Sequence, residues 1–117
     1  MTYLPDIYME FEKKFPELAK AYDALALKIH GWGPLDAKTR RLIKLGVAMG
    51  LHSEGGVKSH ARRALAEGVT PEEIYHAVLL AFTTAGFPSM IAALKWVDEV
   101  VGARKKETGK TRSKSSG

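Results

Sequence analysis

The stretch D-A-K-T-R-R-L-I-K-L-G-V-A-M-G-L, residues 36–51, decides the fold class. Asp36 is a good helix N-cap, because its carboxylate can accept a hydrogen bond from a free backbone N–H of the first turn. The second half of the stretch is apolar on every side, which is typical of a helix buried among other helices. Gly46 and Gly50, four residues apart on one face, predict that another backbone approaches closely there. The stretch therefore predicts a central buried helix.

Apolar residues on both sides of this stretch also follow helical spacing, and no segment of length alternates with the period of two that a strand requires. T-P-E-E, residues 70–73, has the pattern of a capping box, in which threonine and glutamate satisfy backbone groups at a helix start. The other predicted helices cover residues 4–14, 16–30, 54–67 and 71–84, and the last runs from Pro88 past Val100. The expected fold is all-α: a single compact antiparallel helical domain of five to six helices.

The composition narrows the class of protein. The chain has 117 residues, the length of one domain, and it contains no cysteine, which excludes disulfides, thiolate metal sites and thiol chemistry. No apolar run reaches the roughly 20 residues that span a bilayer. The acidic start M-T-Y-L-P-D-I-Y-M-E-F-E lacks the basic and apolar regions of a secretory signal. We therefore expect a cytoplasmic protein with no membrane partner.

The formal net charge is +5, and the whole excess lies in residues 104–117, which hold six Lys or Arg residues and one Glu. Residues 1–103 hold twelve basic and twelve acidic residues. This division predicts a folded domain over residues 1–103 and a basic, disordered tail over residues 104–117, because the tail is too polar to fold. Weak contact of the tail with nucleic acid is compatible with the sequence, but a dedicated nucleic-acid role is not favoured.

The candidate site is S-E-G-G-V-K-S-H, residues 53–60. Ser53 stands where a predicted helix begins, and the free backbone N–H groups there favour an anion. Gly56 and His60 share a helix face, so the absent side chain at Gly56 is expected to leave open space in front of the histidine. With an unperturbed pKa of about 6.5, His60 is a candidate general acid or base. The alternative is a structural or exposed histidine.

Arg40 and Arg41 lie near the start of the helix over residues 36–51, where positive charge is unfavourable to the helix dipole. Solvent exposure is the simplest explanation. The alternative is an anionic partner, because a guanidinium can bind a carboxylate through two hydrogen bonds.

Three motifs together resemble one protein family: T-R-R-L-I at residues 39–43, S-H-A-R-R-A-L-A-E-G-V-T-P-E-E-I at residues 59–74, and A-G-F-P at residues 85–88. They are similar to motifs of the carboxymuconolactone decarboxylase family, which includes the alkyl hydroperoxidase D-like proteins. The resemblance covers residues 34–101. It implies the alkyl hydroperoxidase D-like helical fold and self-association into a ring, a homohexamer or a homotrimer.

One branch of that family reduces peroxides with a C-x-x-C-x-x-x-H relay, to which a glutamate of the preceding helix contributes. By this resemblance the cysteine positions match Ser53 and Gly56, the histidine matches His60, and the glutamate position matches Arg41. Neither serine nor glycine can cycle between dithiol and disulfide, so thiol peroxidase activity is excluded.

The decarboxylase branch lacks those cysteines, and resemblance to it assigns His60 and Glu54 as catalytic residues and Arg40, Ser53 and Gly56 as substrate-binding residues. It implies a cofactor-free lyase for a small anionic substrate, a carboxylated lactone. Arg40 would hold a carboxylate, loss of CO2 would leave a dienolate, and His60 would deliver a proton to carbon. The residues around His60 do not have the spacing of a known metal site, so no metal is expected. Two alternatives stay open: a non-catalytic ring that binds a ligand or partner, and another use of His60 such as hydrolysis or isomerisation.

Overall fold

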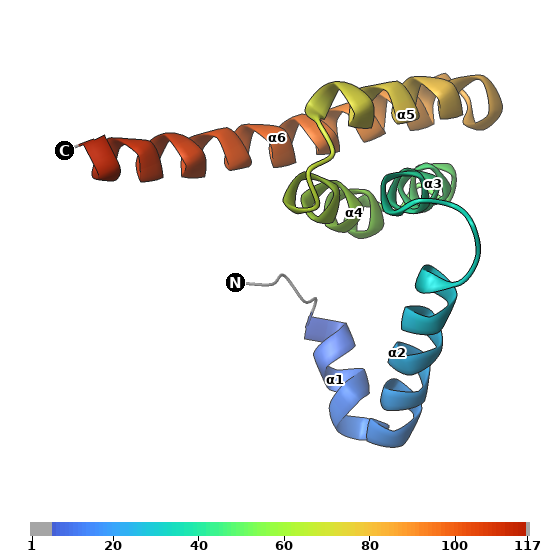
Figure 1. The fold of residues 1–117 in the computed structure, drawn as a ribbon. Helices are drawn as coiled ribbons and strands as arrows, with labels where there is room; N and C mark the ends of the chain where they lie inside the picture. The colour runs from blue at the N-terminus through green and yellow to red at the C-terminus, as the bar shows by residue number, and fades with distance from the viewer. Residues whose placement is uncertain (1–5, 117) are drawn as a thin grey trace. The chain divides into compact units, whose positions relative to one another are not determined.

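Six helices make up the chain in the computed structural model, which describes residues 6–116, with side chains described for residues 7–107. Their bounds are α1 Asp6–Lys14, α2 Pro16–Gly31, α3 Ala37–Gly50, α4 Glu54–Ala66, α5 Pro71–Ala85 and α6 Phe87–Ser116 (Figure 1). The prediction of an all-α fold is confirmed. The helices divide into two compact units, and the division falls immediately before Asp36. Unit 1 contains α1 and α2, and unit 2 contains α3 to α6.

Unit 1 is a pair of helices joined at Phe15, with Pro16 as the first residue of α2. The Tyr8 hydroxyl of α1 donates a hydrogen bond to Asp23 Oδ1 of α2 at 2.6 Å, which raises the pKa of Tyr8 to about 12. Several large apolar side chains of α2 are exposed. Four of them follow helical spacing and form what we name the α2 apolar surface: Leu18, Tyr22, Leu25 and Ile29.

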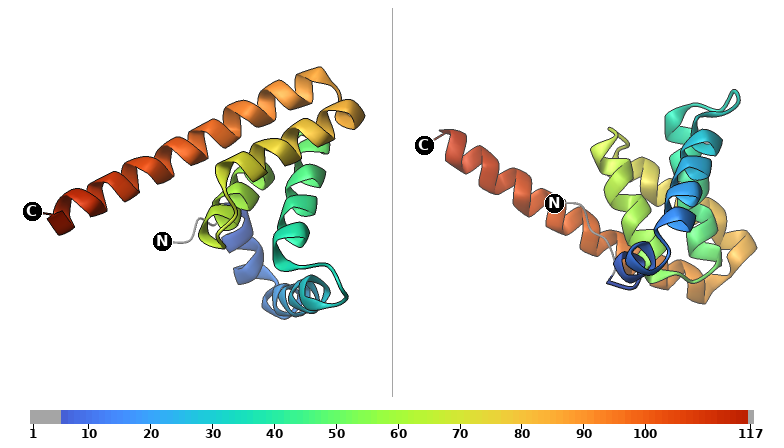
Figure 2. Two further views of the ribbon diagram at one scale, coloured as in Figure 1. Left: turned by 45° about the horizontal axis from the view of Figure 1, so that its top comes forward. Right: turned by 90° about the horizontal axis from the view of Figure 1, so that it is seen from below.

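Unit 2 consists of two layers of paired helices, α3 beside α4 and α5 beside α6, with α3 packed on α5 and α4 packed on α6. Figure 1 shows the first pair nearly end-on and the second pair lengthwise, so the layers cross, and Figure 2 shows them from two other sides. All four helices contribute to one core, whose largest fully buried side chains are Leu45, Met49, Val57, Ile74, Val78 and Val97. Burial of each of these side chains stabilises the unit by about 1.5–3 kcal/mol.

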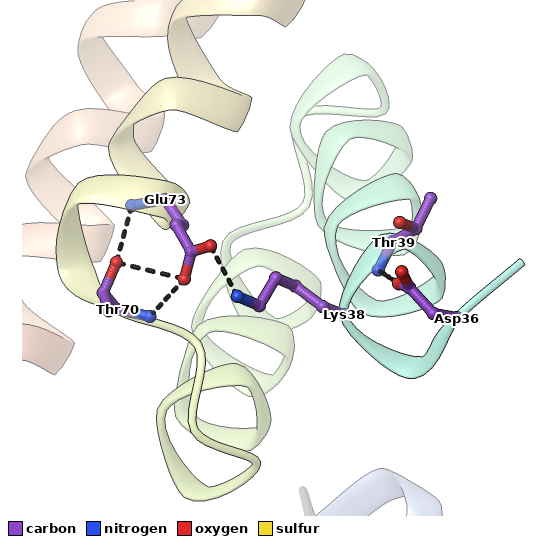
Figure 3. Close-up of polar contacts among 5 residues, drawn as sticks. All are labelled: Asp36, Lys38, Thr39, Thr70 and Glu73. Atoms are coloured by element: carbon purple, nitrogen blue, oxygen red, sulfur yellow. Dashed lines mark hydrogen bonds and ion pairs between the residues drawn. The ribbon is translucent and has the colours of Figure 1, made fainter.

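Polar side chains close the first turns of α3 and α5 (Figure 3). Asp36 Oδ1 accepts a hydrogen bond from Thr39 N at 2.8 Å, as the cap pattern predicts. The predicted capping box is confirmed, because Thr70 Oγ1 accepts from Glu73 N at 3.1 Å and Glu73 Oε1 accepts from Thr70 N at 2.9 Å. Lys38 Nζ donates to Glu73 Oε2 at 2.6 Å and joins the two helix starts. The Lys38 contact, with the capping bonds, lowers the pKa of Glu73 to about 2.

Two expectations for unit 2 are not met. Among the described residues, a side chain at Gly46 or Gly50 would meet no atom within 4 Å, so the predicted close approach of another backbone is wrong within the chain. In addition, α6 continues as a helix to Ser116, where the sequence predicts a disordered tail from residue 104. This tail is rich in Lys and Arg, which are good helix formers, and contains no proline to end the helix. No helix within residues 6–116 is both long and apolar enough to cross a membrane.

Candidate functional site

The start of α4 positions the predicted site. Ser53 is the N-cap of this helix, and its Oγ accepts a hydrogen bond from Gly56 N at 3.0 Å. Val57 and Ala61 of α4 are fully buried in the core. His60 lies beside Ala61 at the border of this buried face and is half-buried. The helix therefore holds the histidine partly out of water.

Arg41 of α3 contacts His60, and the sequence did not predict this contact. Arg41 Nη1 lies 3.0 Å from His60 Nδ1. The same guanidinium binds the carboxylate of Glu67, directly after α4, through Nε to Oε1 and Nη2 to Oε2, both at 2.9 Å. The Arg41 side chain is 7% exposed, so solvent exposure is the wrong explanation for this residue. The anionic partner of Arg41 is Glu67 of the same chain.

The environment of His60 disfavours the protonated ring. Burial lowers the pKa of His60 to about 4, the positive charges of Arg41, Arg63 and Lys44 act in the same direction, and Glu67 opposes them. An ordinary histidine has a pKa of about 6.5. His60 is therefore neutral at pH 7. The prediction that its ring titrates near working pH is wrong, because burial and the neighbouring positive charges lower its pKa.

Four basic residues of α3 and α4, which we name the cationic cluster, are coupled through Lys44: Arg40, Arg41, Lys44 and Arg63. Three of them, Arg41, Lys44 and Arg63, also act on His60. Burial lowers the pKa of Lys44, and the neighbouring charges of the other three lower it further. Arg40 is half-buried in α3, four residues before Lys44. Glu67 is the carboxylate that acts in the opposite direction on both His60 and Lys44.

The open space predicted at Gly56 is not present. A Cβ at this residue would lie 2.9 Å from Ser53 Oγ and 3.0 Å from Ala48 Cβ, both closer than ordinary contact. Gly56 is needed because α4 passes close to α3 and to its own cap. The prediction of a gap for substrate at this position is therefore wrong.

Glu54 does not share a contact with His60, although the structure describes both side chains. Its carboxylate binds Lys58 Nζ at 2.7 Å, and the same ammonium binds Glu99 of α6 at 2.7 Å. These pairs join α4 to α6. Among the described residues, no three His, Asp or Glu side chains come together as metal ligands would.

A separate groove of about 470 Å³ lies between α3 and α5, also within unit 2. Its walls are mainly apolar, with Leu42, Ile43, Gly46 and Leu80 among the lining residues. Glu73 and His76 add polar groups. None of the predicted site residues lines this groove, so the His60 region and the groove are different candidate sites.

One signal in the sequence indicates the burial of Arg41. One face of α3 carries three residues spaced four apart, Arg41, Leu45 and Met49. Leu45 and Met49 belong to an apolar run, so Arg41 falls on the same buried face. Glu67 gives no comparable signal, because its distance from Arg41 along the chain is 26 residues.

A protein family and several known proteins are similar to this chain. The carboxymuconolactone decarboxylase family matches residues 16–99. The uncharacterized protein MJ1511 of Methanocaldococcus jannaschii is 32% identical over 91 residues, which is 78% of this chain and 85% of that protein. The crystal structure of lpg0406, a carboxymuconolactone decarboxylase family protein from Legionella pneumophila, has a TM-score of 0.73 at 26% identity and covers 80% of this chain and 84% of that one. A Burkholderia xenovorans LB400 structure has a TM-score of 0.78 at 23% identity, over 92% of this chain and 84% of that one, which shows a common fold.

Proposed function

Since this chain belongs to the carboxymuconolactone decarboxylase family, we propose that it catalyses cofactor-free decarboxylation, or related proton-transfer chemistry, of a small carboxylated lactone. The observation that carries the proposal is the charge around His60, where the positive charges of Arg41, Arg63 and Lys44 act on the ring and are opposed by Glu67. Excess positive charge around a half-buried ring favours an anionic ligand over a neutral or cationic one.

In the proposed reaction, Arg40 binds one carboxylate of the substrate through its guanidinium. The bond between a ring carbon and a second carboxylate breaks, CO2 leaves, and the electron pair moves onto the lactone carbonyl as a dienolate. His60 donates a hydrogen bond to the dienolate oxygen, where negative charge develops. Water supplies the proton that reaches carbon, because His60, with a pKa of about 4, carries no extra proton at neutral pH.

The other residues that the family resemblance assigned to the site have supporting roles in this proposal. Ser53 and Gly56 fix the start of α4 and thereby the place of His60. Glu54 is engaged with Lys58 in the contact between α4 and α6. The proposal therefore rests on His60 and Arg40.

The test is turnover of carboxymuconolactone by the purified chain, followed as loss of substrate absorbance. His60→Ala is expected to lower kcat about 100-fold, the usual effect of removing a hydrogen-bond donor to a developing oxyanion. Arg40→Ala is expected to raise KM. His76→Ala is the matched control, because His76 is an exposed histidine on α5, and its activity should equal that of the wild type. Absence of wild-type turnover contradicts the proposal for this substrate.

The second candidate function is a family member that binds a carboxylated ligand without catalysis. The filled space at Gly56 favours it, because that space was the place expected for substrate. Wild type without turnover, but with a Tm raised by a dicarboxylate and not by the same compound as its dimethyl ester, is the result expected for this candidate.

We also propose self-association into a ring, a homohexamer or a homotrimer, through the α2 apolar surface. The support is the exposure of its four side chains, between 58% and 61%, because monomers rarely expose contiguous apolar patches of this kind. Light scattering should give a multiple of the chain mass for the wild type and a lower mass for Leu25→Asp. Leu27→Asp is the control, since Leu27 is also exposed but lies outside this surface.

A further inference from the structure

We propose that Arg41 is a positioning residue that holds His60 in the neutral form protonated at Nε2, so that the ring offers a ligand a hydrogen-bond donor and no base. The inference rests on the proposed function for the identity of that ligand. The protonation state itself is a property of the ligand-free chain.

The contact between Arg41 and His60 determines which nitrogen carries the proton. Arg41 Nη1 lies 3.0 Å from His60 Nδ1. A guanidinium has donors only and does not lose its proton in a protein. Nδ1 must therefore be the acceptor, with its lone pair directed at Arg41. A neutral imidazole with a bare Nδ1 has its proton on Nε2.

Glu67 holds Arg41 in the orientation that this contact requires. Two parallel hydrogen bonds of 2.9 Å use Nε and Nη2 of the guanidinium. Such a two-bond contact fixes the plane of the guanidinium as well as its position. Nη1 is the remaining nitrogen, and it points at His60. The glutamate thus acts on His60 through Arg41.

The balance of charge around the ring favours the neutral form. The positive groups are Arg41 and Lys44 on α3 and Arg63 on α4, and the negative group is Glu67, directly after α4. Three positive charges against one negative charge oppose protonation of Nδ1, as does burial. In this form Nε2 carries the proton, and the lone pair of Nδ1 accepts the hydrogen bond from Arg41. Neither ring nitrogen therefore has a free lone pair with which to abstract a proton.

The consequence is a restriction on the ligand. Nε2–H can donate to a carbonyl oxygen, a carboxylate or an enolate, but it cannot accept from a hydroxyl or an ammonium group. Together with the cationic cluster, this donor selects a ligand with an acceptor oxygen and negative charge. The same arrangement excludes Nδ1 as a general base.

Nuclear magnetic resonance of the 15N-labelled, ligand-free chain tests the inference. Long-range correlations between ring protons and ring nitrogens identify which nitrogen of His60 is protonated. The expected wild-type pattern is a bare Nδ1 and a protonated Nε2, unchanged from pH 8 down to pH 5. A protonated Nδ1 in the wild type would overturn the inference by itself, whether or not any variant folds.

Arg41→Gln supplies the second arm, because a glutamine amide can donate or accept and removes the positive charge. We expect both neutral forms of His60 to become populated and the pKa of His60 to rise. Arg63→Gln is the matched control, because it removes an equal charge that also acts on His60. Arg63 is exposed and, among the described contacts, makes no hydrogen bond to His60. This variant should leave Nε2 fully protonated. Equal spectra for Arg41→Gln and Arg63→Gln would show that Arg41 does not fix the proton.

The two tests are independent. A chain that fails to turn over the lactone but shows the Nε2–H pattern leaves the inference standing and removes the proposed reaction. A chain that turns over the lactone with a protonated Nδ1 does the reverse.

Discussion

Replacement of Gly56 by alanine tests the close packing of α4 on α3 at the candidate site. The new Cβ would lie 2.9 Å from Ser53 Oγ and 3.0 Å from Ala48 Cβ. Non-bonded carbon atoms prefer about 3.5–4.0 Å, so either the helices separate or Ser53 leaves its capping position. Gly55 provides the matched control, because it is the neighbouring residue of α4 and a Cβ there meets no described atom within 4 Å.

The magnitude follows from two opposing effects. Alanine is favoured over glycine in a helix by about 0.5–1 kcal/mol, so Gly55→Ala is expected to raise the free energy of unfolding by that amount. The same gain at Gly56 is opposed by about 1–3 kcal/mol of overpacking. Because the helix preference is common to both variants, Gly56→Ala should be less stable than Gly55→Ala by about 1–3 kcal/mol.

Urea denaturation followed by far-ultraviolet circular dichroism measures this difference, with both variants at one protein concentration. Equal stability of the two alanine variants would refute the reasoning, since it would mean that Gly56 has room for a side chain. That result would restore the prediction of an open space in front of His60.

Three further predictions concern caps and protons. Thr70→Ala should lower the free energy of unfolding by about 1 kcal/mol in urea, because the capping box at α5 is lost; an unchanged value would mean that Glu73 alone caps the helix. Glu73 has a folded pKa of about 2, below its ordinary 4.5, so it stabilises the fold above pH 4.5 and this contribution is lost as pH falls toward 2. Glu73→Gln should therefore show a shallower acid loss of stability than the wild type. His60 has a folded pKa of about 4 and an ordinary value of 6.5, so the unfolded chain binds more protons between these values and wild-type stability falls as pH falls from 6.5 to 4. His60→Gln removes that component, and identical slopes for both proteins would contradict the lowered pKa.

The fold could be predicted from the sequence because its signals are local. Asp36 and the Thr70–Glu73 pair act within three residues of themselves, and apolar spacing identifies the helix faces. The end of α6 could not be predicted in the same way. A run of basic residues is typical of a disordered tail, but it also propagates a helix that has already begun.

The local structure around the candidate site could be predicted, but the protonation state of His60 could not. Ser53 caps α4 and His60 lies within that helix, as the spacing predicts. The proton on His60, however, depends on Arg41 and Glu67, which are 19 and seven residues away along the chain and meet only through packing of α4 on α3. Likewise, glycine at position 56 is compatible with a gap or with a close approach, and only the neighbours Ser53 and Ala48 decide between them.

The Arg41–Glu67 pair also limits which single substitutions the chain tolerates. Arg41→Glu alone would set two carboxylates against each other beside His60. Changing Glu67 first would leave the guanidinium, now 7% exposed, without its counter-ion. Either single change removes the ion pair and leaves a charge near His60 without its partner. We therefore expect the two positions to be coupled, so that a double substitution costs less stability than the sum of the single ones.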